Sequence, residues 1–206
     1  MNKNLVFVFL VCMLLAFNRY ECEAQNSKSY GKWQLVEQVD EFGDPLGESI
    51  LYYETKGTFS NTTIANKNSV TVQILFTKGY GVYMQFIEYG KYYASLYTGI
   101  NTPLSVKTQS GKVTKFLMVP RSEGRIFPLA ISDVTRKWGY EDFALFIDMI
   151  KKETTVRCHF YDQNKRSYSF KIDCRGFTKA YDAFLKDNNI QGVKIFDSDF
   201  LYDIGD

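Results

Sequence analysis

Short runs of alternating apolar and polar residues fill most of the chain from residue 30 to residue 131, and Gly, Asn and Asp separate many of them. Alternation with a period of two is typical of β-strands that bury one face. The predicted strands are residues 32–39, 50–54, 70–76, 82–89, 92–97, 113–119 and 125–131. Their spacing predicts an antiparallel β-sandwich, or a barrel-like sheet, rather than alternating strands and helices.

The period changes after residue 142, where apolar residues at helical spacing predict two short helices, at 141–152 and 177–187. Between them, a hairpin that turns at residues 163–165 alternates in the same way as the earlier strands. Its predicted inward side carries Val156, Cys158, Phe160, Phe170, Ile172 and Cys174. Its outward side carries Arg157, His159, Lys171 and Asp173. The chain is therefore predicted to be a mainly β single domain with two short α-helices in its C-terminal third.

The central hairpin permits a residue-by-residue prediction, because a three-residue turn at 89–91 with a left-handed glycine sets its register. The facing pairs are Tyr83 with Tyr97, Met84 with Leu96, Phe86 with Ala94, and Ile87 with Tyr93. One face is apolar and is expected to be buried: Val82, Met84, Phe86, Ala94 and Leu96. The other face makes Tyr83, Tyr93 and Tyr97 the candidate binding surface, since tyrosine combines an apolar ring with a polar tip. The alternative is that these tyrosines pack beneath a loop or a neighbouring strand.

The N-terminal segment predicts export. An apolar run at residues 5–17 follows Lys3, and Cys22 and Ala24 place small residues where a signal peptidase cleaves. We expect residues 1–24 to be a signal peptide, Gln25 to begin the mature protein, and the location to be periplasmic or secreted. A membrane anchor is the alternative, but the run is short for a ~30 Å hydrocarbon layer, so no membrane span is expected after signal removal. Residues 25–206 then form one β-rich domain, with an ordered core at about 30–187 and a tail at 188–206.

Composition narrows the possible functions. Lys and Arg number 25, Asp and Glu number 23, and the net charge is +2, so charge gives no argument for nucleic-acid binding. The aromatic content of 17% fits a strand-rich protein. The sequence contains no phosphate loop, dinucleotide fingerprint or zinc-ligand spacing, so no cofactor is expected.

Few residues point to catalysis. His159 is the single histidine, and its place on the outward side of a strand favours a surface or packing role over a Ser-His-Asp constellation. Four acidic residues gather in one turn and offer oxygen ligands for Ca²⁺: Asp40, Glu41, Asp44 and Glu48. Their spacing does not match an EF-hand, so a solvated turn is the preferred interpretation. No catalytic or metal-binding residue is therefore assigned.

Cys158 and Cys174 are the cysteines that follow the predicted signal peptide, and they form the candidate disulfide. An oxidising compartment favours the bond. With the tight turn at 163–165, however, Cys158 faces Phe170 and lies about 13 Å along the strand from the position opposite Cys174. Since a disulfide requires Cα atoms within about 7 Å, the bond needs a wider loop or a bulge.

Two stretches carry a resemblance to known proteins. A helix, a hairpin and then Gly-Phe-Thr-Lys-Ala-Tyr at residues 176–181, entering the last helix, resemble the C-terminal part of the invasion-associated locus B family of exported bacterial proteins. Val-Asp-Glu-Phe-Gly-Asp-Pro at residues 39–45, followed by Gly-Thr-Phe-Ser-Asn at 57–61, is similar to uncharacterised exported proteins of Gram-negative bacteria. These resemblances imply an exported, β-sandwich-like envelope domain and bring no catalytic residue.

Two functions from different classes remain open. The preferred hypothesis is a non-enzymatic module that binds a protein or a glycan through a strand face or through loops. The alternative is a hydrolase that acts on an envelope or extracellular polymer through paired carboxylates. The sequence lacks a nucleophile or metal motif, which favours binding. A groove with two close carboxylates, at least one of raised pKa, would favour the hydrolase.

Overall fold

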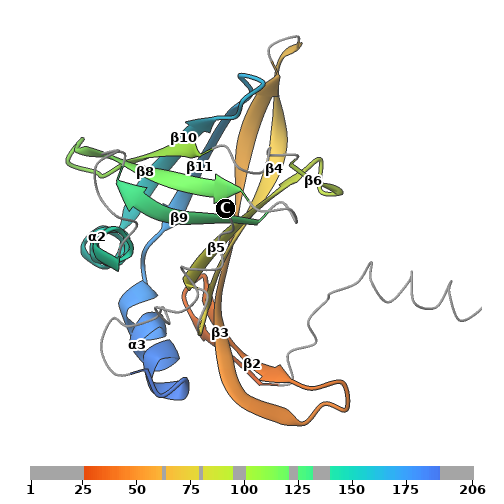
Figure 1. The fold of residues 1–206 in the computed structure, drawn as a ribbon, viewed down its shortest axis with the longest axis vertical. Coiled ribbons are helices and arrows are strands. Elements are labelled where there is room, and N and C mark those ends of the chain that lie inside the picture. Colours follow the sequence, from red (N-terminus) through yellow and green to blue (C-terminus); the bar gives the residue numbers. More distant parts are fainter. Residues whose placement is uncertain are drawn as a thin grey trace, which may run out of the picture.

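The computed structural model describes residues 26–61, 64–78, 81–94, 101–120, 125–131 and 140–190. Figure 1 shows the elements in chain order. They are β1 Ser27–Tyr30, β2 Trp33–Val39, β3 Pro45–Asn61, β4 Ile64–Thr77, β5 Gly81–Glu88, β6 Tyr92–Tyr93, β7 Thr102–Lys107, β8 Val113–Pro120, β9 Arg125–Ile131, α2 Tyr140–Lys152, β10 Thr155–Tyr161, β11 Ser167–Asp173 and α3 Phe177–Asp187. The predicted mainly β fold with two helices in the C-terminal third is confirmed.

The strands form one antiparallel, 11-stranded sheet. Its order is β1-β2-β3-β11-β10-β7-β8-β9-β5-β4, with β6 on β5. A further pairing joins β4 to β3 and gives a barrel-like arrangement. The sheet is not closed: in the part of the chain that the structure describes, β5 and β9 share the two pairs Met84–Ile126 and Gln85–Arg125.

The strand β3 is much longer than the predicted strand at 50–54 and organises the sheet, as its curved ribbon in Figure 1 shows. One edge of β3 pairs first with β2 and then with β11, while β4 follows the other edge. At the β11 contact, a Cβ on Gly57 would lie 2.5 Å from the Ser169 carbonyl oxygen and 2.8 Å from the Phe170 Cβ. Glycine at this position therefore lets β11 pack closely against β3.

The central hairpin follows its predicted register as far as Ala94. Gly90 has a left-handed φ of 70°, and Ile87 faces Tyr93. The backbone N–H of Ala94 donates a hydrogen bond to the Phe86 carbonyl at 2.7 Å. The described members of the predicted apolar face are buried: Val82, Met84, Phe86 and Ala94.

Beyond Ala94 the predicted pairing of this hairpin is replaced. The predicted partner of Met84 is Leu96, but β9 occupies this edge of β5 and places Ile126 opposite Met84. The prediction that Met84 pairs with Leu96 is therefore wrong, since β9, the antiparallel partner of β8, occupies this edge. Leu96 itself lies outside the described residues.

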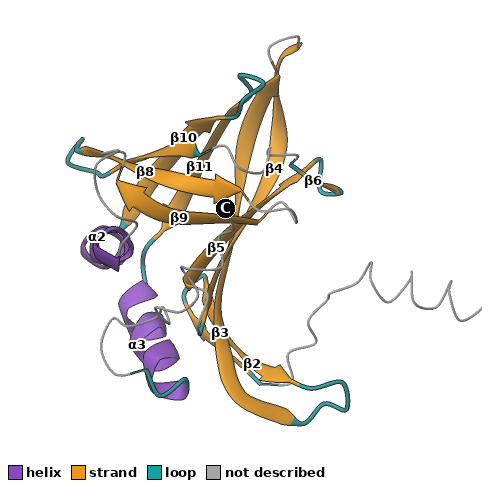
Figure 2. Ribbon diagram, in the orientation of Figure 1, coloured by secondary structure: helices purple, strands orange, loops and turns teal. Residues whose placement is uncertain are grey.

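Both helices lie on the same side of the molecule in Figure 2, where they pack onto the inner aromatic core. The Trp33 ring lies 4.7 Å from Phe177 of α3, and its indole N–H donates to the Asp173 carbonyl at 3.0 Å. Phe146 of α2 makes an edge contact with Phe116 of β8 at 5.5 Å. Across the described residues, no helix has the length and apolar character required to span a membrane.

Candidate functional site

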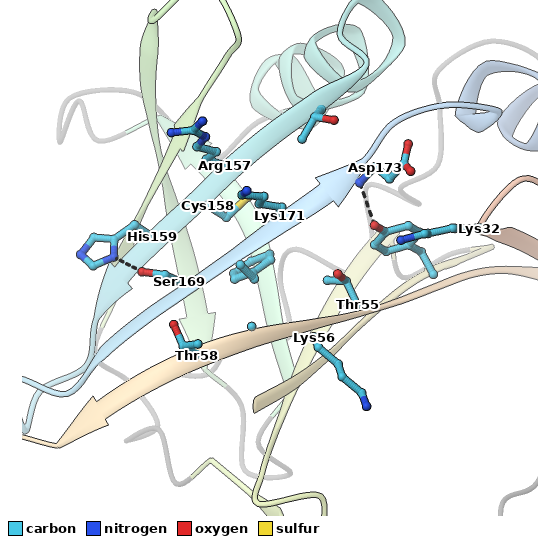
Figure 3. A pocket seen from close by; sticks show the side chains of 14 residues that line it. Lys32, Thr55, Lys56, Thr58, Arg157, Cys158, His159, Ser169, Lys171 and Asp173 are labelled. Carbon is cyan, nitrogen blue, oxygen red and sulfur yellow. Dashed lines mark hydrogen bonds between the residues drawn. The ribbon is translucent and has the colours of Figure 1, made fainter. Parts of the chain in front are cut away.

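The outer face of β3, β11 and β10 carries an open groove of about 860 Å³. Figure 3 shows the side chains that line it. Because successive strand residues point to opposite faces, the burial of Val156, Cys158 and Phe160 turns the alternate residues of β10 outward. The predicted inward and outward sides of the β10–β11 hairpin are confirmed by its burial pattern.

Three basic residues occupy facing positions on three adjacent strands of this face. Arg157 of β10 faces Lys171 of β11 on one side and Lys107 of β7 on the other. We call these three exposed side chains the cation row. Within the part of the chain that the structure describes, none of them forms an ion pair. Like charges in facing positions destabilise a sheet, so the three cations repel one another, and no ion pair among the described residues offsets that repulsion.

Asp173 is the only acidic side chain among the described residues that line the groove, and it does not neutralise the cation row. Its carboxylate accepts hydrogen bonds from Arg175 Nε at 2.8 Å and Arg175 Nη2 at 2.5 Å. The hydrogen bond from Arg175 lowers the pKa of Asp173, although partial burial acts in the opposite direction. Lys32 and Lys56 also line the groove, so positive charge predominates there.

A second row of facing residues offers hydrogen-bonding groups. Ser169 of β11 lies between Thr58 of β3 and His159 of β10, and His159 in turn faces Ser105 of β7. We call these four residues the hydroxyl row. His159 Nδ1 and Ser169 Oγ are hydrogen-bonded at 2.8 Å, as the dashed line in Figure 3 shows. The predicted surface position of His159 is confirmed, and the row adds polar groups beside the cations.

Beyond the groove lining, β10 presents an exposed aromatic ring. Tyr161 is 60% exposed and lies two residues after His159 on the outward side of β10. The two rings make an edge contact, with centroids 4.7 Å apart and an interplanar angle of 87°. The contact with His159 orients the Tyr161 ring while leaving much of its surface open to a ligand.

The predicted tyrosine surface is only partly described. Tyr93 on β6 is 58% exposed, while Tyr83 on β5 is half-buried. Tyr97 lies outside the described residues. A recognition surface built from all three tyrosines therefore stays a prediction, and the basic outer face becomes the better-defined candidate.

The two cysteines of the candidate disulfide are free thiols in the core. Cys158 faces Phe170, as the tight turn predicted, and its register separates it from Cys174 along the hairpin. Burial raises the pKa of the Cys158 thiol, and burial likewise raises the pKa of Cys174 to about 12. Both side chains therefore remain protonated and unreactive at neutral pH.

The acidic turn between β2 and β3 uses its carboxylates for local contacts. Asp40 Oδ1 accepts hydrogen bonds from the backbone N–H groups of Phe42 and Asp44, each at 2.9 Å. Glu48 pairs with Lys78 at 3.0 Å. Glu41 adds a further charge to this turn. Such bonding is typical of a turn stabilised by an aspartate side chain, and the described residues contain no cluster suited to a metal ion.

A second polar cluster lies largely buried beside the β10–β11 turn. Arg166 donates from Nε to Asp162 at 2.6 Å and from Nη1 to Glu88 at 3.0 Å. The Tyr168 hydroxyl donates to the same Glu88 oxygen at 2.5 Å. Burial and this hydrogen bond raise the pKa of Tyr168. The two carboxylates are close together, but both bind Arg166, so they attach the turn to β5 instead of facing the groove.

Lys107, Ser105 and Thr58 are the site residues that the sequence pattern missed, because no strand was predicted at β7 and the strand predicted within β3 ended at residue 54. For β7 the available signal was the alternation of its residues, of which Thr102, Leu104 and Val106 are buried. Pro103 obscured that pattern, since proline is uncommon inside strands.

Comparison with known proteins identifies no relative: no family model matches the chain, and no curated protein or solved structure matches it. The resemblance to the invasion-associated locus B family and to exported Gram-negative proteins therefore stays a prediction. The cation row, the hydroxyl row and Tyr161 are the features of the molecule that indicate a function.

Proposed function

We propose that this protein is an exported, non-enzymatic module, periplasmic or secreted, that binds an anionic ligand on the outer face of β3, β11, β10 and β7. The cation row carries the proposal. Arg157 lies between Lys171 and Lys107, and the described part of the chain supplies no acidic partner to any of them. The predicted signal peptide at residues 1–24 supports export.

An anionic ligand would relieve the repulsion within the cation row. Clustered like charges raise the local electrostatic potential, whereas the whole chain, with a net charge of +2, is close to neutral. This face therefore differs from the rest of a nearly neutral chain because its positive charges are gathered in one place. An open groove suits a chain or a macromolecular surface, while small-molecule sites are usually enclosed.

A hydrolase is the second candidate, and one observation favours it. His159 and Ser169 form a hydrogen-bonded pair of the kind that a base and its nucleophile require. Two features argue against catalysis. Among the described contacts, no carboxylate orients His159. Ser169 also lies within β11, between paired strands on both sides, so its backbone is engaged in the sheet and is poorly placed to stabilise an oxyanion.

The test of the proposal is the affinity of the purified mature protein for two polyanions, heparin and poly-L-glutamate. We expect Arg157→Gln and Lys171→Gln each to weaken binding about fivefold, because a cation near an anionic surface contributes about 1 kcal/mol. Binding should also weaken as salt screens the charges.

Lys179→Gln is the matched control, because Lys179 is exposed on α3 and the substitution changes the net charge equally. The control should bind like the wild type. If Lys179→Gln weakens binding as much as Lys171→Gln, attraction to net charge explains the affinity and the proposed site is wrong. Absence of binding to both polyanions would also contradict the proposal.

A further inference from the structure

We infer that the occupant of this face is an anionic polysaccharide, a sugar chain that carries carboxylate or sulfate groups. The inference rests on the proposed function and names its ligand class. It draws on three observations: the exposed ring of Tyr161, the hydroxyl row beside the cations, and the absence of an open strand edge in the described part of the groove.

Tyr161 is the feature that a purely electrostatic site does not need. Its ring is 60% exposed and is oriented by the edge contact with His159. Tyrosine presents an apolar face together with a polar tip, a combination that suits the C–H face and hydroxyl groups of a pyranose. An acidic peptide offers carboxylates to the cation row but has no comparable flat apolar face for this ring.

The sheet also disfavours an extended peptide. Peptides that bind sheets commonly add a strand to an open edge and exchange backbone hydrogen bonds. At the groove, β11 is paired with β3 and β10, and β10 is paired with β11 and β7. The surface is therefore built from side chains, and its hydroxyl row can exchange hydrogen bonds with sugar hydroxyl groups.

Spacing along β10 sets a minimum ligand length. Tyr161 and Arg157 are four residues apart on one strand, a separation of about 13 Å at ~3.3 Å per residue. The cation row crosses two gaps between strands, which together span about 10 Å. A monosaccharide reaches either the ring or the cations, whereas an oligosaccharide reaches both with the hydroxyl row between them.

The experiment compares calorimetric titrations of the mature protein with heparin, polygalacturonate, monomeric galacturonate, poly-L-glutamate and neutral dextran at one ionic strength. We expect both acidic polysaccharides to bind more tightly than poly-L-glutamate, and dextran and monomeric galacturonate to bind at least tenfold more weakly than polygalacturonate. Tyr161→Ala should weaken binding of the polysaccharides about fivefold and leave poly-L-glutamate unchanged. Tyr161→Phe, which keeps the ring, should retain most of the affinity.

Tyr92→Ala is the matched control, because Tyr92 is 66% exposed on β6. It should bind every polymer like the wild type, and thermal unfolding should confirm that each variant is folded. If Tyr161→Ala affects all polyanions equally, or none of them, the site is a general anion surface. The glycan inference is then wrong, while the proposed function stands. Failure of the wild type to bind any polyanion contradicts both.

Discussion

Arg157 makes opposite contributions to folding and to the proposed binding. It faces Lys171 and Lys107 in the folded sheet, and no described acidic side chain pairs with it. Like charges in facing positions oppose the folded state, because unfolding separates them. The same concentration of charge attracts an anion. A residue in such a position is expected to be retained for binding at a small loss of stability.

Arg157→Gln should therefore stabilise the unliganded protein, by about 0.2–1 kcal/mol at low ionic strength. The gain should shrink in high salt, since the Debye length falls from about 30 Å at 0.01 M to about 3 Å at 1 M. Thermal unfolding at the two salt concentrations measures the effect, with Lys179→Gln as the control. A salt-independent loss of stability in Arg157→Gln would show that repulsion does not dominate at this position.

Asn188, the residue that follows α3, joins this helix to β3 through its side-chain amide. Asn188 Oδ1 accepts a hydrogen bond from the Ser49 N–H at 3.1 Å, and its Nδ2 donates to the Ser49 carbonyl at 3.1 Å. Nδ2 also donates to the Phe184 carbonyl at 2.9 Å. The pairing of β4 with β3 ends at Leu51, so the Asn188 amide satisfies backbone groups beyond the end of that strand pair.

Asn188→Ala should lower the free energy of unfolding by about 1–3 kcal/mol, because it leaves the buried backbone groups of Ser49 without partners. Urea denaturation measures the change, which should appear in the midpoint with little change in slope. Lys186→Ala, an exposed substitution on the same helix, is the control. Equal stability of Asn188→Ala and the wild type would mean that water replaces the amide at no net loss.

The sequence predicted the elements that are determined by local residue patterns. It missed the strands whose length or position depends on residues far away in the sequence. The two helices and the β10–β11 hairpin follow from periodicity and from a short turn, so their faces were predicted together with Arg157, His159 and Lys171. The length of β3 depends on long-range packing. So does the change of partner along one of its edges, which pairs with β2 and then, from Gly57 onward, with β11. Lys107 belongs to the site because β7 pairs with β10, a contact between strands that are far apart in the sequence.

In the folded molecule, the same strands that bury the core also present the proposed site. Along β10, inward Cys158 and Phe160 alternate with outward Arg157, His159 and Tyr161. The outer face draws its residues from β3, β7, β10 and β11, which are separated in sequence. An overall charge of +2 therefore gives no indication of the basic face, because its cations are brought together only by folding.

The most direct test of the proposed binding site is lysine footprinting, in which acetylation of each lysine is followed by mass spectrometry with and without bound heparin. If the ligand occupies the cation row, Lys107 and Lys171 should lose reactivity on binding. Lys179 and Lys186, both exposed on α3, should keep theirs. Protection of Lys179 and Lys186 while Lys107 and Lys171 remain reactive would contradict the assignment of the binding site to this face.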